Sequence, residues 1–478
     1  MKKKKKIGNP QSGIWKKMLI IAFWLMVWQI VCLFVDNPIF FAGPLEMIKE
    51  LVHMAGRRDF IDSVLHSLLR IMGGFCIAFL LACLLASAAY HCKLLEDLLS
   101  PFVTFIKSVP VASVVVLLLI WFGAKYLSIY VTFMVVFPNI YLNVLNGLKN
   151  TDKDLLEMAE VFRFPFIQKL FYIYCPAVMP YLLSGAVISV GMSFKSGVAA
   201  EVIGLPVSSI GEGLYNAKIY LNTAGVFAWT AVIILLSSLV EWLVVWLLKQ
   251  FGRQDRRTFK RKRRETRRKQ DAPEIREKTS FILDDVTVSF DEKKVLDHMD
   301  VRLDEGGIYC IMGQSGCGKT TLLRVCAGLQ KPTDGRVYYM SNSVPGENVG
   351  KKKTGMAFQE DCLCMQLSAL NNVLLTADRQ YSTETVISLL SEIFPKEALQ
   401  QPAEQLSGGM KRRIAVARAV LSDADCLLLD EPFAGLDEEN HERLSRWILK
   451  NRNGRLLVIT THDEADIGRM GAAVLRLD

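Results

Sequence analysis

The sequence predicts an α-helical transmembrane domain of about six spans followed by a soluble α/β domain. The chain has 478 residues, 51% of them hydrophobic, and this length is enough for two or three domains. Long apolar runs dominate residues 1–250, residues 279–478 have the composition of a soluble α/β domain, and a strongly basic stretch lies between them. We therefore expect a membrane domain at 1–250, a basic cytoplasmic linker at 251–278 and a soluble domain at 279–478.

The net charge of +9 does not indicate a nucleic-acid partner. Most of the positive charge lies in Lys2–Lys6 and Lys249–Lys269, both next to apolar runs. Lys and Arg gather at such positions on the cytoplasmic side of membrane proteins, where they also contact anionic lipid. We therefore expect a lipid membrane, and no nucleic acid, as a partner.

The eleven cysteines form no CxxC pair and have no regular spacing. We therefore expect neither a disulfide framework nor a zinc site. Reduced thiols suit a protein that faces the cytosol.

Six apolar runs are candidate membrane spans, because a spanning helix needs about 20 mostly apolar residues. They are Met18–Val35, Leu68–Tyr90, Phe102–Phe122, Leu127–Leu145, Ala177–Phe194 and Val226–Leu248. No small-residue cleavage site follows the first run, so we expect an uncleaved span. The third run contains Lys107 and Pro110, which predicts a kink. Six spans place both termini on one side, and the adjacent basic residues indicate that this side is cytoplasmic.

Residues Lys149–Tyr172 then form a cytoplasmic loop between the fourth and fifth spans. The stretch is rich in charged residues and helix formers, and Thr151 is placed to cap a helix with Asp154 three residues later. A helical loop on that side is the expected place for a contact with the soluble domain.

Apolar patterns predict the main elements of the soluble domain. Alternation indicates a strand in Phe281–Phe290, and Gly307–Met312 is a second strand. Residues Val373–Phe394 have the pattern of a helix. The short runs Cys426–Leu429 and Leu456–Ile459 suit buried parallel strands.

A glycine-rich turn, Gly313–Thr320, follows the second strand and opens a helix. It matches G-x-x-x-x-G-K-[ST] without deviation. Glycines let backbone N–H groups approach phosphate oxygens, and the helix N-terminus adds positive potential. Lys319 would reach the β- and γ-phosphates, and the Thr320 hydroxyl would ligate Mg²⁺. We therefore predict that ATP and Mg²⁺ bind at Gly313, Gln314, Ser315, Gly316, Cys317, Gly318, Lys319, Thr320 and Thr321.

Two acidic residues end the strand Cys426–Leu429. Asp430 would hold Mg²⁺, directly or through water. Glu431 would polarise the attacking water as a general base. Taken alone, such a pattern usually marks a strand that meets a polar turn, but its position after a phosphate-binding turn favours catalysis.

A second candidate anion-binding turn is Ser407-Gly408-Gly409, which opens the predicted helix Met410–Leu421. One domain rarely needs two such sites for its own nucleotide. The pattern therefore predicts that this turn serves the nucleotide of a second subunit.

Together these motifs resemble the nucleotide-binding domain of ABC transporters, an α/β P-loop ATPase fold, over residues 279–478. The resemblance implies that Phe290 stacks on adenine and that Gln359 contacts Mg²⁺ and the permease. It also implies that Asp437 belongs to the D-loop and that His462 contacts the γ-phosphate. One departure is Gly307-Ile308, where the family often has Gly-Glu.

The resemblance completes the predicted site, because the roles of Gln359 and His462 are assigned from it. The predicted catalytic residues are Glu431, His462 and Gln359. The predicted Mg²⁺ ligands are Thr320, Gln359 and Asp430.

Residues 38–250 resemble the permeases of binding-protein-dependent importers, especially the nitrate/sulfonate/taurine branch. The cytoplasmic loop of that family has Glu-Ala-Ala, three residues, Gly, nine residues, Ile, one residue and Leu-Pro. Here Glu157, Ala159, Ile173 and Pro176 keep the spacing, and the family's first Ala, its Gly and its Leu are replaced by Met158, Arg163 and Cys175. Further matches are Ser67–Arg70, Pro101, Val109-Pro110, Trp121–Gly123, Ala200-Glu201 and Gly211–Gly213. The resemblance implies that the loop docks beside Gln359.

The resemblance implies a transport ATPase that imports a small solute across the cytoplasmic (inner) membrane. The expected solute is a sulfonate, taurine, nitrate or a thiamine-type pyrimidine precursor. We expect a multi-pass homodimer with its ATPase domain in the cytoplasm and a separate extracytoplasmic solute-binding protein. Permease and ATPase are usually separate chains in this branch, so their fusion is itself a departure.

Two other functions stay open. An exporter also joins six spans to an ATPase in this order, although exporter helices usually reach further into the cytoplasm. A non-transporting ATPase that transmits force to a membrane partner is the second alternative. For Lys195, an interfacial position and an anion-attracting position in the pathway are both open, and Glu241 is expected to be a partnered structural acid.

Overall fold

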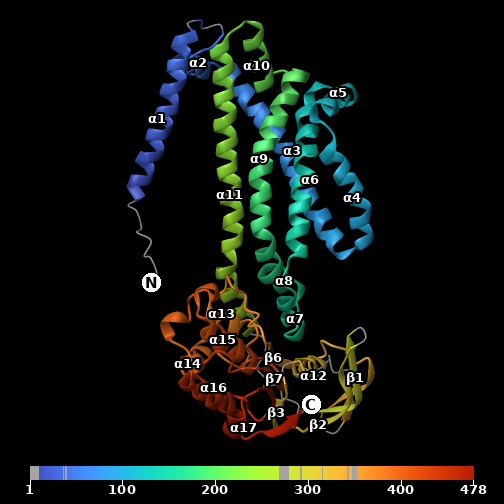
Figure 1. Ribbon diagram of the computed structural model, residues 1–478. Coiled ribbons are helices and arrows are strands. Elements are labelled where there is room, and N and C mark those ends of the chain that lie inside the picture. The colour runs from blue at the N-terminus through green and yellow to red at the C-terminus, as the bar shows by residue number, and fades with distance from the viewer. Residues whose placement is uncertain are drawn as a thin grey trace. The chain divides into compact units, whose positions relative to one another are not determined.

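The computed structural model describes residues 10–35, 37, 40–267, 279–290, 293–314, 316–341, 344–346 and 353–477. Its chain forms two compact units (Figure 1). The helical unit comprises Met1–Asn150 and Val178–Gly252, and the α/β unit comprises Thr151–Ala177 and Arg253–Asp478. We name Thr151–Ala177 the coupling segment. It packs with the α/β unit although it lies between two membrane helices in the sequence.

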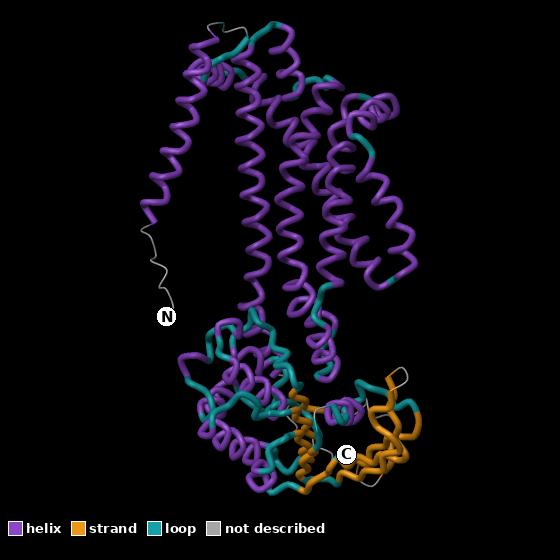
Figure 2. Tube along the Cα trace, viewed as in Figure 1, coloured by secondary structure: helices purple, strands orange, loops and turns teal. Residues whose placement is uncertain are grey.

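The helical unit contains helices and no strand among its described residues (Figure 2). Its elements are α1 (Pro10–Val35), α2 (Pro44–Ala55), α3 (Arg58–His91), α4 (Lys93–Ser108), α5 (Val111–Phe122), η1 (Ala124–Tyr126), α6 (Leu127–Lys149), α9 (Cys175–Gly204), α10 (Ile210–Ile219) and α11 (Thr223–Arg267). Five segments are long and apolar enough to cross a membrane: Met18–Val35, Arg58–His91, Ala124–Lys149, Phe166–Gly204 and Thr223–Gln250. These segments contain five of the six predicted spans.

The third predicted span, Phe102–Phe122, is not one kinked helix. It is divided between α4 and α5, which meet at 101°. The break falls at Val109-Pro110, because proline lacks the N–H of a helical hydrogen bond and disfavours helical geometry in the residue before it. In Figure 1, α4 runs back beside α6 and α5 turns aside at the helix end. The described residues therefore give five spans, or six if the bent pair crosses the membrane.

Close helix packing in the helical unit depends on small residues. A Cβ atom on Gly74 of α3 would lie 2.5 Å from the carbonyl oxygen of Ile129 in α6. A Cβ atom on Gly197 of α9 would lie 2.7 Å from Ile71 of α3. Small residues let membrane helices approach closely, so α3, α6 and α9 form the packed centre of this unit.

A buried polar cluster fixes the end of α9. Glu201 is fully buried and accepts a hydrogen bond from Ser67 Oγ at 2.6 Å. Arg70 Nη1 lies 3.8 Å from the same carboxylate. Ser67 Oγ also accepts from the backbone N–H of Ile210 at 2.9 Å, so the cluster joins α3, α9 and α10.

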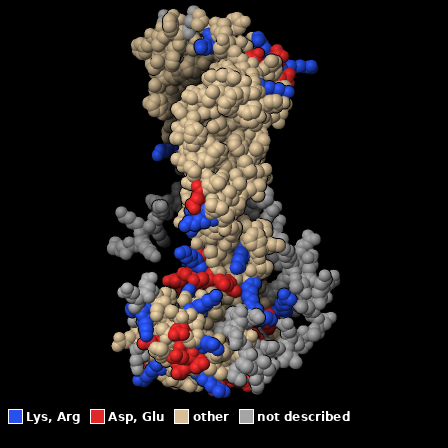
Figure 3. Space-filling model, turned by 90° about the vertical axis from the view of Figure 1, so that its right-hand side faces the viewer, with Lys and Arg blue, Asp and Glu red and all other residues tan. Residues whose placement is uncertain are grey.

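Figure 3 shows charged side chains near the ends of the helices and mostly uncharged side chains over the middle of the helical unit. The exposed faces of α3 and α11 carry large apolar residues, among them Leu80, Leu84, Leu235 and Leu239. Glu241 of α11 is half-buried, and no described residue forms an ion pair or hydrogen bond with its side chain, so the predicted partner is not found in this part of the chain.

The α/β unit holds all the described strands. They are β1 (Thr279–Phe290), β2 (Lys293–Leu303), β3 (Ile308–Met312), β4 (Asp334–Ser341), β5 (Val344–Gly346), β6 (Thr354–Ala357), β7 (Cys426–Asp430), β8 (Leu456–Thr460) and β9 (Ala473–Arg476). Its helices and helical turns are α7 (Lys153–Val161), α8 (Phe166–Lys169), η2 (Leu170–Tyr174), α12 (Lys319–Cys326), α13 (Ala369–Leu374), α14 (Thr383–Ser391), η4 (Lys396–Ala398), η5 (Ala403–Gln405), α15 (Gly408–Val420), α16 (Glu438–Asn451) and α17 (Ala465–Met470).

Two sheets build this unit. One is antiparallel with strand order β2-β1-β4-β5, and the other is parallel with order β6-β7-β8-β3-β9. The strands predicted at β1, β3, β7 and β8 are all present. Because β3, β7 and β8 are parallel neighbours, their carboxyl ends bring the residues that follow each strand to one edge of the sheet.

Three local predictions differ from the structure. The helix predicted at Val373–Phe394 is two helices, and Ser382 caps the second by accepting from the N–H of Thr385 at 2.9 Å. Asp152, rather than Thr151, caps α7 by accepting from the N–H of Asp154 at 2.9 Å. Helix α11 continues to Arg267, so the predicted linker begins as helix.

Candidate functional site

The phosphate loop, Gly313–Thr320, connects β3 to α12. Gly316 and Gly318 have φ values of 89° and 100°, a region that favours glycine. A Cβ atom on Gly318 would also lie 2.8 Å from Leu296. Lys319 is buried, and its Nζ donates to the carbonyl oxygens of Gly313 and Gln314 at 2.7 and 2.9 Å. The loop therefore closes around the lysine ammonium group; the predicted residue Ser315 lies outside the described residues.

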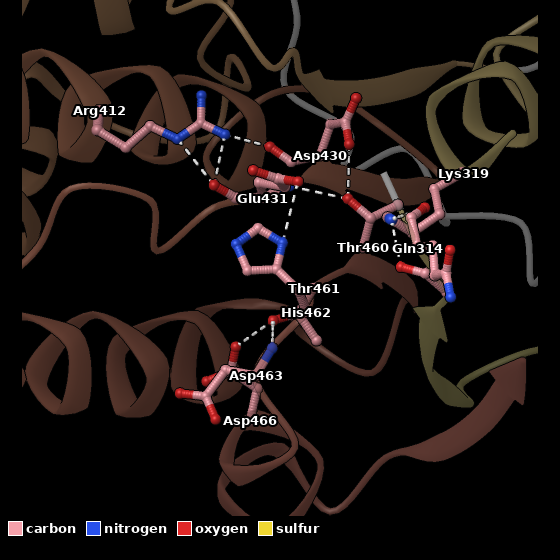
Figure 4. A network of polar contacts seen from close by, with 11 residues as sticks. Gln314, Lys319, Arg412, Asp430, Glu431, Thr460, Thr461, His462, Asp463 and Asp466 are labelled. Atoms are coloured by element: carbon pink, nitrogen blue, oxygen red, sulfur yellow. Dashed lines mark hydrogen bonds and ion pairs between the residues drawn. The ribbon is translucent and has the colours of Figure 1, made fainter. Parts of the chain in front are cut away.

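Asp430 ends β7 and Glu431 follows it, beside this loop (Figure 4). Asp430 is 2% exposed, and its Oδ1 accepts from Thr460 Oγ1 at 2.6 Å. The same threonine oxygen accepts from the backbone N–H of Glu431 at 2.9 Å. Glu431 has φ of 47°, a strained conformation that costs on the order of 1–3 kcal/mol in a non-glycine residue. The turn therefore holds the Glu431 side chain away from the direction that a continuing strand would give it.

His462 faces Glu431 across the end of β8. Its Nδ1 lies 3.2 Å from Glu431 Oε1, and Figure 4 shows the ring directed at the carboxylate. Thr461 Oγ1 donates to Asp466 Oδ2 at 2.5 Å and accepts from the N–H of Asp463 at 3.1 Å, so the residues around His462 are held in place. The structure thus brings together two of the three predicted catalytic side chains.

Arg412, on α15, is a residue that the sequence analysis missed. It is 4% exposed and donates to the carbonyl oxygens of Phe358 at 2.6 Å and Glu431 at 2.7 Å, and also to that of Asp430. Burial lowers the pKa of its guanidinium, which is opposed by nearby Asp361. Arg412 therefore links the backbone at Gln359, the third predicted catalytic residue, to the backbone of the two acids. The only signal for Arg412 in the sequence is a basic residue in line with the buried apolar face of α15.

One of the predicted Mg²⁺ ligands, Asp430, has an oxygen atom that is suited to bind a cation. Asp430 Oδ2 is buried and has no hydrogen-bond partner among the described residues, and Mg²⁺ prefers such oxygen ligands. Thr320 opens α12 and is half-buried, and Gln359 is exposed. Groups of three or more His, Cys, Asp or Glu side chains that could hold a metal do not occur in the described parts of the chain. A metal here would therefore depend on Asp430, the Thr320 hydroxyl, the Gln359 amide and phosphate oxygens.

The remaining predicted nucleotide contacts lie on exposed surfaces. Ser407 and Gly408 are exposed at the start of α15, with Gly409 half-buried behind them. Asp437 accepts from the N–H of Asn440 at 2.9 Å, and this hydrogen bond lowers the pKa of its carboxyl group. Phe290 is 48% exposed at the end of β1.

The coupling segment packs into the apolar core of the α/β unit. Ala159 is fully buried and Ile173 is 2% exposed, in a cluster that includes Phe358. Glu157 Oε1 accepts from Arg324 Nη2 of α12 at 2.6 Å. Gln366 Nε2 donates to the backbone oxygen of Tyr172 at 3.0 Å. The segment therefore contacts both the residues before Gln359 and the helix after the phosphate loop.

Two further positions in the coupling segment bear on the predicted motif. Pro176, the last predicted motif residue, is half-buried. Arg163, which stands where the related permeases have glycine, has φ of 52°. The backbone thus keeps a glycine-type conformation although the residue has changed.

Two family models match different parts of the chain. Residues 296–434 match the model described as "ABC transporter". Residues 75–253 match the model described as "Binding-protein-dependent transport system inner membrane component".

Curated relatives match the α/β part of the chain. The sulfate/thiosulfate import ATP-binding protein CysA of Pseudomonas syringae pv. tomato is 34% identical over 192 residues, which cover 38% of this chain and 59% of the relative. This chain thus spans less than two thirds of the length of that relative and of its counterpart from Mesostigma viride.

A further relative is covered almost completely. The lipoprotein-releasing system ATP-binding protein LolD of Bacteroides fragilis is 34% identical over 201 residues, which cover 38% of this chain and 91% of the relative. The identity to this relative and the share of it that is covered, together with the two family models, show that the chain belongs to the ABC transporter family. One polypeptide carries both a permease domain of the binding-protein-dependent type and an ABC ATPase domain.

Proposed function

We propose that the protein imports a small anion across the cytoplasmic membrane at the expense of ATP. Two copies of the chain form the transporter, with both ATPase domains in the cytoplasm, and a separate extracytoplasmic solute-binding protein delivers the solute. The observation that carries this proposal is the match of residues 75–253 to a binding-protein-dependent permease within the same chain as an ABC ATPase. The burial of the coupling segment in the ATPase core supports the link between the two domains.

The permease match, rather than the ATPase match, supports import. One ATPase relative is named for sulfate/thiosulfate import and another for lipoprotein release, at the same 34% identity. The ATPase sequence therefore does not separate import from other uses of ATP. The import relatives favour a sulfate-like anion, and the resemblance of the permease favours a sulfonate, taurine or nitrate, so a small oxyanion is the shared class.

In the proposed ATPase cycle, each nucleotide lies between the phosphate loop of one copy and Ser407–Gly409 of the other. Lys319 exchanges its two carbonyl acceptors for phosphate oxygens. Asp430, Thr320 and Gln359 would hold Mg²⁺, which would supply positive charge to stabilise the phosphate oxygens. Glu431 accepts a proton from the attacking water, and His462 orients Glu431 and contacts the γ-phosphate.

The contacts of Arg412 offer a route from hydrolysis to the coupling segment. This side chain binds the backbone of Glu431 and of Phe358 at the same time. Phe358 lies in the apolar cluster with Ala159 and Ile173. A shift of the Glu431 backbone during turnover therefore moves the surface on which the coupling segment rests, and α6 and α9, at its two ends, receive the motion.

Uptake into proteoliposomes tests the proposal. The full chain is reconstituted with the solute-binding protein that co-purifies from native membranes, and labelled sulfate, thiosulfate, taurine and nitrate are each added outside with ATP enclosed. We expect ATP-dependent accumulation of at least one anion, absent from the Glu431→Gln variant. ATP-dependent flux only in the opposite direction would replace import with export. ATP hydrolysis without flux of any co-purifying solute would favour a force-transmitting ATPase.

A further inference from the structure

Lys195 lies inside the apolar span that ends at Gly204. It is nine residues before that end, or about 13 Å along the helix. Its side chain is exposed, and no hydrogen bond or ion pair joins it to any described residue. A lysine in the hydrocarbon of a bilayer costs about 2.5–3.5 kcal/mol. Such residues therefore usually face a polar cavity or a partner.

The exposed face of α9 differs from the other exposed helix faces. It contains Ser184, Ile188, Met192, Lys195 and Ala199, which recur at three- and four-residue intervals and are all exposed. We name these five residues the α9 face. The exposed faces of α3 and α11 carry large apolar side chains, as lipid contact requires. The α9 face instead places Ser184, Ala199 and one cation beside the apolar side chains of Ile188 and Met192.

Packing of the opposite side of α9 prevents this face from turning inward. Ser189, Ser193, Gly197 and Glu201 are buried on that side. Gly197 leaves no space for a Cβ atom against Ile71, and Glu201 is held by the Ser67 hydroxyl at 2.6 Å. The rotation of α9 about its axis is therefore fixed, and Lys195 meets whatever lies beside this surface.

We infer that the α9 face lines the solute pathway between two copies of the chain, and that Lys195 is a recognition residue for an oxyanion such as a sulfate or a sulfonate. This inference rests on the proposed function, because a pathway between copies requires a transporting dimer. Two such faces, one from each copy, would place two ammonium groups along one pathway and concentrate anions there. A lysine that snorkels to the lipid interface would leave the deeper residues of the face in hydrocarbon.

Met192 distinguishes a solute pathway from lipid contact, because it is one turn deeper than Lys195 on the same face. The test uses the full chain in liposomes, with exposed Cys76 and Cys92 replaced by Ala to give a parent chain. Met192→Cys is treated from outside with an anionic thiol reagent, sulfonatoethyl methanethiosulfonate, and with its trimethylammonium counterpart. Leu84→Cys on the apolar face of α3 is the matched control for lipid contact.

We expect Met192→Cys to react with the anionic reagent at a rate well above that of Leu84→Cys. Adding Lys195→Gln should lower the anionic rate and raise the cationic rate about fivefold each, the effect of one unit charge about 4 Å away in water, so the ratio of the two rates should fall by about 25-fold. Lys195→Arg should keep the ratio. These results would support both the pathway position and the charge effect.

Two results overturn the inference. If Met192→Cys is as unreactive as Leu84→Cys, the α9 face contacts lipid. If it reacts but Lys195→Gln leaves the ratio unchanged, the lysine does not recognise anions. ATP hydrolysis and anion uptake by the parent chain are measured separately, so a parent that neither hydrolyses ATP nor takes up anions refutes the proposed function and not the accessibility of this face.

Discussion

Arg324 Nη2 donates to Glu157 Oε1 at 2.6 Å and so links the helix after the phosphate loop to the coupling segment. Both side chains are about 30% exposed. A pair with this exposure adds little to stability, at most about 1 kcal/mol. Its position suggests a different use, because it joins the nucleotide site to the segment that follows α6.

Reversing these charges tests whether the pair transmits motion. We expect Glu157→Arg or Arg324→Glu alone to lower anion uptake per ATP hydrolysed several-fold, since like charges would then repel across the contact. The double variant restores the opposite charges and should recover most of the uptake. Uptake and hydrolysis are measured in the same liposomes. Equal coupling in the single variants and the double variant would show that the pair has no role in transmission.

Glu431→Gln removes the predicted general base without changing the size of the side chain. General-base catalysis contributes roughly 10²–10⁴-fold, so we expect ATP hydrolysis to fall by at least about 100-fold. Binding of a fluorescent ATP analogue should persist, because Lys319 and the phosphate loop are unchanged. Near-normal hydrolysis would reject the role of Glu431, and loss of binding would point to a folding defect.

Arg412→Ala should destabilise the ATPase domain and lower its activity together. The variant leaves several buried carbonyl oxygens without their donor, and an unpaired buried polar group costs on the order of 1–3 kcal/mol. Lys411→Ala on the same helix is the matched control, since Lys411 is half-buried and its side chain makes no hydrogen bond or ion pair within the described residues. Thermal unfolding and ATP hydrolysis are the readouts. If the two variants have the same stability and the same rate of ATP hydrolysis, Arg412 has no special role in the site.

Cys317 lies inside the phosphate loop, and a bulky thiol reagent there should block ATP. The thiol is half-buried, and a Cβ atom on Gly313 would lie 2.5 Å from its Sγ, so the loop has no room for an adduct. Burial raises the pKa of Cys326 and of Cys362 to about 12, so both remain protonated and unreactive at pH 8. We expect N-ethylmaleimide to inhibit hydrolysis unless ATP is present. Unchanged inhibition of Cys317→Ala would assign the effect to another cysteine.

The sequence predicted those parts of the site that are contiguous in the chain. The phosphate loop, Asp430 and Glu431 each adjoin a short apolar strand, so a local pattern was sufficient. Arg412 could not be predicted, because its acceptors are backbone carbonyl groups from two separate segments, one after β6 and one at the end of β7. Only the folded chain brings those groups together, and nothing in the sequence separates Arg412 from the neighbouring Lys411 and Arg413.

The fold, like the site, could be predicted where local patterns specify it, but not where it depends on contacts between distant parts of the chain. Apolar length and basic flanks located the membrane helices, but hydropathy alone did not divide Phe102–Phe122 at Pro110. The proline predicted a kink within one helix, whereas two separate helices meet there at 101°. The packing of the coupling segment with the α/β unit depends on apolar contacts of Ala159 and Ile173 with residues about 200 positions later, which a single sequence does not specify.

Arg163 offers a test of how this chain tolerates a departure from its family. Its φ of 52° lies in a region that disfavours side chains by roughly 1–2 kcal/mol per residue. Arg163→Gly relieves this strain but also removes side-chain contacts, and Arg163→Ala removes the same contacts while keeping the strain. Glycine also loses more backbone entropy on folding, by roughly 0.5–1 kcal/mol relative to alanine. We therefore expect Arg163→Gly to unfold at a higher temperature than Arg163→Ala by a few degrees at most, with uptake unchanged. If Arg163→Ala is the more stable variant, the left-handed conformation is not maintained in the protein, and the turn between α7 and α8 has adapted to the loss of glycine.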